Sequence, residues 1–551
     1  MFHNKQRGKP GAIASPTKRL RNRVHNLFLS SSLSAIEATG LETDAAACGL
    51  SGFKTVPEKS GKNAARDLLR RCLKKSQWPP IYTAEIRIWD EKHEVARYAD
   101  VGFMLPHEIM YVLFQKNPGY PFHDLACCAQ SVQDHCLEAS RKLGFEVIPF
   151  SLWTDATPFN WDRSKSLEVI LMSLPQLPAP HHTWRFPVTA LPKNNISKGE
   201  SFEDIWDIMA WSSQQLLLGT MPRHGHDGQP FAEAWRNKHA GREIAHRCIL
   251  AELRADWKCL AEVFGLPHWG AKTGICMRCS ADLTNYKDFS ENAPWMLERY
   301  GHWDFLQRQL NEARLISTIF RCPFFSTTCF KMDWLHIMDL GCAQDCLGNL
   351  FWYVLPRLGN NQKVQVATLF LEIKKFYREN SIQDCIGKLT LGMIKKPDKS
   401  KPKMNLRAAE TRAMIPFAWK IADKMLDPQD VFESSIRWVI KYLVDCYDCL
   451  SALKWERNYF RECCFAFLRQ YSVLETMADE GKWVMKPKFH MLAEIALKGD
   501  KPSDNWVYRD EEAGGTMARV AHAKGGPVNQ WSISFQALNK FSAEFSVPHF
   551  D

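Results

Sequence analysis

The fold is indicated most clearly by the stretch FEVIPFSLWTDATPFNWDRSKSLEVILMSLPQLP, residues 145–178. Two β-rich apolar runs flank a short polar loop in it, a pattern typical of a β-hairpin. Asp155 lies at the end of the first run, so the hairpin is expected to present a carboxylate at one of its ends. A third apolar run, residues 184–191, would complete a three-stranded meander.

The elements that follow extend this meander into an α/β fold. Residues 202–219 carry apolar side chains at helical spacing, which predicts an amphipathic helix packed on a sheet. Residues 244–253 predict a fourth strand that ends just before Asp256, although their Ala, Glu, Leu and Arg content favours a helix from Glu243 onward as the competing local structure. With the strand, the order is strand, strand, strand, helix, strand, which is the order of a ribonuclease-H-like core with a mixed sheet.

The rest of the chain is predicted to form parts around this core. Residues 1–63 lack periodicity and are rich in Gly, Ser, Ala, Lys and Arg, which predicts a flexible basic arm. Residues 64–142 show a helical pattern and are expected to be a helical lead-in to the first part of the core, residues 143–273. Residues 274–486 show no alternation of apolar and polar residues, which indicates a large helical insertion. The last part of the core is then expected over residues 487–551.

The composition limits where the protein works and what it binds. No apolar run reaches the roughly 18–20 residues that a bilayer span needs, and the basic, polar start lacks the apolar centre of a secretory signal. We therefore expect no membrane partner and a reducing compartment, where the 18 cysteines serve as core residues and metal ligands. The formal net charge of +10 permits a polyanionic partner such as nucleic acid.

Acidic residues stand where such a core would hold divalent cations. Asp155 ends the first strand, Asp256 follows the fourth, and Glu511 and Glu512 open a helix predicted over residues 508–523. Phosphodiester cleavage on a ribonuclease-H-like core uses two Mg²⁺ ions roughly 4 Å apart, which hard carboxylate oxygens bind. The pattern therefore predicts a site built from Asp155, Asp256 and one of the two glutamates, with Mg²⁺ or Mn²⁺ as cofactor.

A second cluster, CMRC at residues 276–279, has the spacing of a zinc knuckle. Its thiolates, Cys276 and Cys279, would supply half of a tetrahedral Zn²⁺ site, which then needs two more ligands. The downstream candidates are His302, Cys322, Cys329 and His336. Of these we predict His302 and His336. The alternative is a chance pair of cysteines, with His336 a core histidine and Asp339 the cap of the following helix.

Two basic segments are candidate DNA contacts. The first lies near the start of the chain and contains Lys18, Arg19 and Arg21. It is typical of either a nuclear import signal or an arm that contacts phosphates. The second precedes the predicted catalytic helix and contains Lys486, Lys488 and His490. A solvated surface explains either segment equally well.

Taken together, these motifs resemble the transposases of the CACTA and Kyakuja-Dileera-Zisupton type over roughly residues 106–541. The matching pieces are the strand with Asp155, SLP at 173–175, ADW at 255–257, the cysteine pair at 276–279, HIMD at 336–339, AAETR at 408–412 and KPKFH at 486–490. The resemblance implies a cut-and-paste DNA transposase with a DDE ribonuclease-H-like core, in which Asp155, Asp256 and Glu511, or Glu512 in its place, hold the cations. It also implies double-stranded DNA as partner, a dimer or larger assembly on DNA, and the nucleus as the place of action.

The sequence departs from this group because no zinc-finger or helix-turn-helix module is recognisable ahead of the core. This departure leaves a second hypothesis, a catalytically inactive, domesticated remnant that acts as a DNA- or protein-binding scaffold. A metal-dependent hydrolase of other substrates on an unrelated fold is a third, since a fold alone does not determine chemistry.

Overall fold

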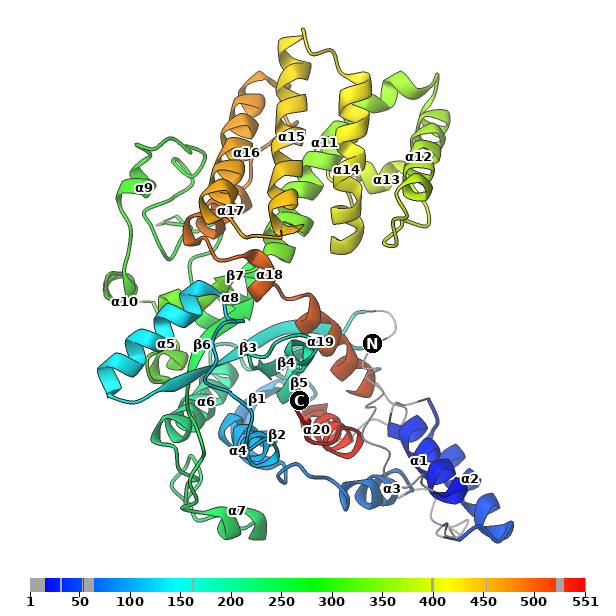
Figure 1. Ribbon diagram of the computed structural model, residues 1–551, viewed down its shortest axis with the longest axis vertical. Helices are drawn as coiled ribbons and strands as arrows, with labels where there is room; N and C mark the ends of the chain where they lie inside the picture. Colours follow the sequence, from blue (N-terminus) through cyan, green and yellow to red (C-terminus); the bar gives the residue numbers. More distant parts are fainter. Residues whose placement is uncertain are drawn as a thin grey trace.

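A mixed five-stranded sheet lies at the centre of the computed structural model (Figure 1). The structure describes residues 15–29, 32–51, 53, 64–160, 163–272, 274–312, 314–397, 401–451, 453–521 and 530–550. The strand order is β5-β4-β3-β6-β7. The strands are β3 (Val147–Pro158), β4 (Ser166–Ser173), β5 (Phe186–Pro192), β6 (Arg247–Ala255) and β7 (Phe330–Met332). Neighbours among β3, β4 and β5 are antiparallel, whereas β6 runs parallel to β3 and β7 runs parallel to β6.

The central strands are apolar along their length because both faces of the sheet are covered. Every residue of β5 and all but the first of β4 are buried, and such continuous burial is typical of a strand between two layers. The helices that pack on these strands are α5 (Gln130–Leu143), α6 (Ser201–Leu218), α8 (Trp257–Phe264), α19 (Tyr508–Ala521) and α20 (Ile533–Glu544).

The predicted meander, the helix after it and the fourth strand are confirmed. They correspond to β3, β4, β5, α6 and β6, in that chain order, with a short helix α7 (Ala234–His239) between α6 and β6. The competing helix from Glu243 onward is wrong: residues 247–255 are clamped between β3 and β7, and these tertiary contacts override helix propensity. The protein is therefore an α/β protein with a mixed sheet.

The helical lead-in predicted for residues 64–142 is wrong in its middle. Helices α3 (Ala64–Leu73) and α4 (Pro106–Lys116) flank an antiparallel hairpin of β1 (Tyr82–Asp90) and β2 (Val95–Phe103). Buried and exposed residues alternate along β1, which is the period of a strand with one covered face. That alternation was present in the sequence as the signal for a strand.

The predicted flexible arm contains two helices, α1 (Pro16–Leu29) and α2 (Ala35–Ala47). A capping box between Ser34 and Glu37 begins α2. Apolar side chains of α1 and α2, among them Phe28 and Ala38, pack with Leu68 of α3 in a small separate core. These parts of the arm therefore contain helical structure that the sequence pattern did not predict. The other parts of the arm, residues 1–14, 30–31, 52 and 54–63, lie outside the described residues.

The predicted insertion is helical from residue 343 onward, and this part forms one end of the molecule (Figure 1). Its helices are α11 (Ala343–Val354), α12 (Gln362–Glu379), α13 (Leu391–Ile394), α14 (Ala408–Met425), α15 (Val431–Ser451) and α16 (Arg457–Met477). The part before residue 335 is mostly irregular, with the short helices α9 (Pro294–Leu297) and α10 (His302–Asn311), and it supplies β7 to the central sheet. A π-helical segment, Leu335–Cys342, leads from β7 into α11.

The chain returns to the sheet later than predicted. Helix α17 (Pro487–Lys498) packs on α16 and on the π-helical segment, and has only a small contact with the short edge strand β7. A short helix, α18 (Pro502–Asn505), then leads to α19, which packs on β3 and β4. In the part of the chain that the structure describes, no helix combines the length and the apolar character needed to cross a bilayer.

Candidate metal centres

A first cluster lies where β3, the π-helical segment and α19 meet. It consists of Asp155 from β3, His336 from the π-helical segment and Glu511 from α19. One oxygen or nitrogen atom from each of these side chains lies within 4.8 Å of the other two. The three residues come from distant parts of the sequence, so the cluster exists only in the folded chain.

Asp155 and Asp256 lie at the same edge of the sheet because their strands are parallel neighbours. The paired part of β3 and β6 ends at Trp153 and Arg254, and the two aspartates follow. Asp256 is the N-cap of α8, where one carboxylate oxygen accepts the backbone N–H of Cys259 at 2.5 Å. Asp256 is close enough for its charge to raise the pKa of Asp155, but it is not one of the three residues in the 4.8 Å cluster.

Helix α19 presents only one of its consecutive acids to this edge. Asp510 is fully buried and accepts bonds from Arg185 Nε at 2.6 Å and from Arg254 Nη2 at 3.1 Å. Glu512 points elsewhere and accepts a bond from Arg509 at 2.9 Å. Successive residues of a helix point about 100° apart, so Glu511 alone faces Asp155. Of the two candidates, Glu511 and not Glu512 therefore lies in the cluster with Asp155.

A glycine allows α19 to approach the strand that carries Asp155. A Cβ atom on Gly514 would lie 2.9 Å from the ring of Trp153 and 3.0 Å from the hydroxyl of Thr157. Such distances are closer than side-chain contacts allow, so the close packing of this helix on β3 depends on glycine. The approach sets the distance between Glu511 and Asp155.

Each carboxylate at this edge makes ionisation of its neighbours less favourable. Burial, and then the charge of Asp256, raise the pKa of Asp155 to about 6. Burial and the charge of Asp155 raise the pKa of Glu511 to about 8. On β4, burial raises the pKa of Glu168 to about 7 although Lys193 opposes the shift. Carboxylates that are held together against their repulsion are typical of a site for divalent cations.

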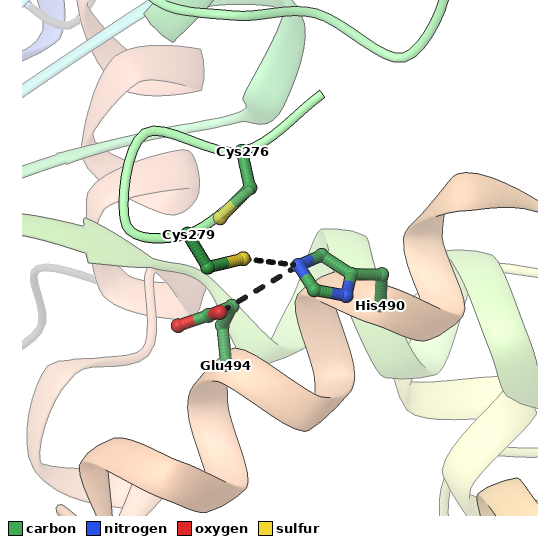
Figure 2. Close-up of side chains that lie close together, drawn as sticks. All are labelled: Cys276, Cys279, His490 and Glu494. Carbon is green, nitrogen blue, oxygen red and sulfur yellow. Dashed lines mark hydrogen bonds and ion pairs between the residues drawn. The ribbon is translucent and has the colours of Figure 1, made fainter. Parts of the chain in front are cut away.

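A second cluster contains the predicted cysteine pair. Cys276 and Cys279 lie beside His490 and Glu494 of α17 (Figure 2). All four side chains are buried, and one ligand atom from each lies within 4.8 Å of the others. His490 Nε2 is 3.3 Å from Cys279 Sγ and 3.5 Å from a Glu494 oxygen. A spacing of four residues puts His490 and Glu494 on one face of the helix.

The charges of this second cluster suit a metal ion. Although burial opposes the shift, hydrogen bonds with Cys279 and His490 lower the pKa of Cys276 to about 6, whereas burial and the neighbouring Cys276 raise the pKa of Cys279. Burial also opposes ionisation of Glu494, yet Arg299 holds the pKa of this carboxyl down at about 2. The Arg299 guanidinium donates to both Glu494 oxygens, at 2.6 and 2.7 Å, and thereby orients the carboxylate.

The predicted histidine ligands of this centre are wrong. His336 lies in the carboxylate cluster, and His302 begins α10, where its Nδ1 accepts the backbone N–H of Thr327 at 3.4 Å. Of the other candidates, Cys329 lies 3.7 Å from His135 and Cys322 is buried in the apolar core. A His-x-x-x-Glu pair, whose spacing suits one face of a helix, was the signal for the observed partners, but only the fold brings it to the cysteines.

The predicted DNA contacts have mixed outcomes. His490 is completely buried, which excludes contact with a phosphate backbone. Lys486 pairs with Asp345 at 2.5 Å, and Lys488 donates to the carbonyl of His336 at 2.9 Å, so both ammonium groups stabilise the fold. On α1, Lys18 and Arg19 are exposed and Arg21 is half-buried.

Fold and site together define the class: an α/β protein with two clusters of side chains suited to divalent cations. No protein-family model and no curated protein matches the sequence.

Proposed function

We propose that this protein is a metal-dependent DNA endonuclease and strand-transfer enzyme of the DDE transposase type, built on a ribonuclease-H-like core. The observation that carries the proposal is the convergence of Asp155, Asp256 and Glu511 at one edge of the sheet, from β3, from the end of β6 and from α19. The chain order of three antiparallel strands, a helix and a parallel strand also supports a core of this type.

The chemistry of the donor set fits hard divalent cations, Mg²⁺ or Mn²⁺. Bound cations would supply the Lewis acidity that phosphodiester cleavage requires. Asp155, Asp256 and Glu511 would hold them at the sheet edge, where the partial burial of the carboxylates limits competition from water. The buried ion pairs of Asp510 keep Glu511 aimed at that edge during the reaction.

We also propose Zn²⁺ for the cluster of Cys276, Cys279, His490 and Glu494. Two sulfur atoms, an imidazole nitrogen and a carboxylate oxygen form a donor set that Zn²⁺ accepts with tetrahedral geometry. All four ligands are buried, which leaves little access for a substrate and favours a structural role. The ion would tie the irregular first part of the insertion to α17.

Double-stranded DNA is the partner that this proposal requires, with two or more copies of the protein acting on paired DNA ends in the nucleus. The basic excess of the chain and the exposed Lys18 and Arg19 on α1 favour an anionic partner.

The proposal is tested by nicking of supercoiled DNA. Wild-type protein should convert it to the open circular form with Mg²⁺ or Mn²⁺ and not with EDTA, and Asp256→Asn should reduce the rate by about 100-fold or more, because misplacing a reacting group has effects of this size. Equal nicking by the wild type and by this variant would show that the carboxylates do not perform the reaction.

A further inference from the structure

We propose that His336 is a direct ligand of the cation held by Asp155 and Glu511, and that this position therefore prefers a first-row transition cation such as Mn²⁺ to Mg²⁺. The inference deepens the proposed function and rests on it for the identity of the two carboxylate ligands. It adds a nitrogen donor to a site for which only oxygen donors are expected.

The imidazole of His336 is oriented toward the carboxylates by its other nitrogen. Nδ1 lies 2.6 Å from Asp333 Oδ2, which directs Nε2 to a point 3.8 Å from a Glu511 oxygen. A metal-binding histidine typically bonds a carboxylate through its second ring nitrogen, and this bond sets both the tautomer and the ring orientation. His336 already has this arrangement.

Asp333 is itself held by the backbone. It is 2% exposed, and its oxygens accept N–H groups from Leu335 at 3.2 Å, from His336 at 2.9 Å and from Val507 at 3.3 Å. These donors come from the π-helical segment and from the residue just before α19. The same contacts therefore position both His336 and the helix that carries Glu511. A π-helical segment departs from α-helical geometry, and such departures are frequent at functional sites.

Glu511 has a carboxylate oxygen available for a cation. Its Oε1 atom is buried and has no hydrogen-bond partner among the described residues. A buried polar atom without a partner is costly unless something else satisfies it. A cation between Asp155, His336 and Glu511 would do so.

Asp256 is less suited to be the third ligand at this position. One of its oxygens accepts the backbone N–H of Cys259 at the start of α8. His336, and not Asp256, lies with Asp155 and Glu511 in the 4.8 Å cluster. Asp256 is then left to hold a second cation with Asp155. Mg²⁺ favours oxygen donors and water, whereas an imidazole nitrogen raises the affinity for first-row transition cations.

The competing arrangement is a protonated His336 that replaces a cation. An imidazolium beside Asp155 and Glu511 would neutralise them through ion pairs. Although burial opposes the shift, Asp333 and the other nearby carboxylates raise the pKa of His336 to about 9 when no cation is bound. The two arrangements predict opposite effects of removing the imidazole, because a ligand strengthens cation binding and a resident positive charge weakens it.

Pulsed electron paramagnetic resonance of bound Mn²⁺ separates the two arrangements without using activity. The full chain, with its cysteine site filled by Zn²⁺, should show coupling of Mn²⁺ to a ¹⁴N nucleus. His336→Ala should abolish this coupling and weaken Mn²⁺ binding by about tenfold or more in calorimetry, with a much smaller effect on Mg²⁺. His302→Ala is the control and should leave both readouts unchanged.

Absence of ¹⁴N coupling in the wild type would overturn the inference, and this measurement does not depend on whether a variant folds. Mn²⁺ affinity that is unchanged or increased in His336→Ala would overturn it as well. DNA nicking without nitrogen coupling would contradict this inference alone, whereas nitrogen coupling without nicking would contradict only the proposed function.

Discussion

At the scale of single residues, the structure distinguishes most clearly between the surroundings of Glu511 and Glu512. The two side chains are neighbours in sequence and identical in chemistry, but one faces Asp155 and the other pairs with Arg509. Glu511→Gln should therefore reduce DNA nicking by about 100-fold or more. Glu512→Gln should stay within about twofold of wild type, since it removes only an exposed ion pair.

The same assay would reveal an error in this assignment. A large loss in Glu512→Gln with normal activity in Glu511→Gln would mean that α19 is rotated about its axis relative to the structure described. Circular dichroism of both variants would verify that neither change unfolds the protein.

Some of the site could be predicted from local sequence and some could not. Asp155 ends the apolar part of one strand and Asp256 follows another, and both apolar patterns are strong, so their place at a sheet edge was predictable. The choice between Glu511 and Glu512 depends on the rotation of a helix, and that rotation is set by contacts with Arg185 and Arg254 that are remote in sequence. The position of His336 depends in the same way on the packing of the π-helical segment beside α19.

At the scale of elements, the buried ion pairs of Asp510 anchor α19. Asp510→Ala would leave the guanidinium groups of Arg185 and Arg254, which are 7% and 3% exposed, buried with fewer partners. Breaking a buried pair in this way typically costs about 3–5 kcal/mol. Urea unfolding should show a loss of this size, and Arg509→Ala, an exposed change on the same helix, should lose less than about 1 kcal/mol. A loss below about 1 kcal/mol in Asp510→Ala would contradict the anchoring role.

The packing of α1, α2 and α3 should depend on pH through His25. This imidazole lies 2.7 Å from Glu42, whose other oxygen accepts a bond from Arg71 at 2.6 Å. Hydrogen bonds with Cys72 and Glu42 raise the pKa of His25 to about 9. A raised histidine pKa means that the protonated form stabilises the folded state below about pH 6.5 and that this contribution is lost as pH rises through about 9.

The expected cost of His25→Ala is therefore larger at about pH 6 than at about pH 10, by on the order of 1–2 kcal/mol. Hydrogen exchange of the amides in α1, corrected for the intrinsic rate at each pH, measures this difference. An equal cost at both pH values would mean that the ion pair with Glu42 contributes nothing.

The elements that sequence patterns missed share a physical cause. In the hairpin, buried and exposed residues alternate along β1, whereas the first four residues of β2 are all exposed, so β2 has no clear period. β7 has three residues, too few for any periodicity, and it forms a strand only because the edge of β6 offers unpaired backbone groups. The core strands β4 and β5, by contrast, were predictable because burial on both faces requires continuous apolar sequence.

At the scale of the whole molecule, the zinc centre is expected to join the parts of the insertion. Removing the ion with a chelator should separate Cys276 and Cys279 from α17 and lower the midpoint of thermal unfolding by roughly 5 °C or more. Elemental analysis should find about one Zn²⁺ per chain, the number that one such four-ligand site would hold. Cys279→Ser should lose the ion, and Cys127→Ser, at an exposed cysteine, should retain it. A protein that binds no zinc and has an unchanged midpoint after chelation would contradict the assignment.

The overall arrangement also explains why the chain can contain so large an insertion between the acidic residues of this site. Asp256 and Glu511 are separated by the whole helical end of the molecule, yet the chain leaves the sheet after β7 and returns through α18 (Figure 1). The sheet edge is therefore built from both sides of the insertion, and its carboxylates can act as one site.

The central claim is that the carboxylates at this edge hold divalent cations with which the protein cleaves DNA phosphodiester bonds. The most direct test is the rate at which wild-type protein and Asp155→Asn nick supercoiled DNA in Mn²⁺, measured side by side with both proteins shown to be folded. Nicking by the wild type that falls by about 100-fold or more in the variant is the predicted result. Nicking at equal rates, or no nicking by the wild type with either Mg²⁺ or Mn²⁺, would contradict the claim.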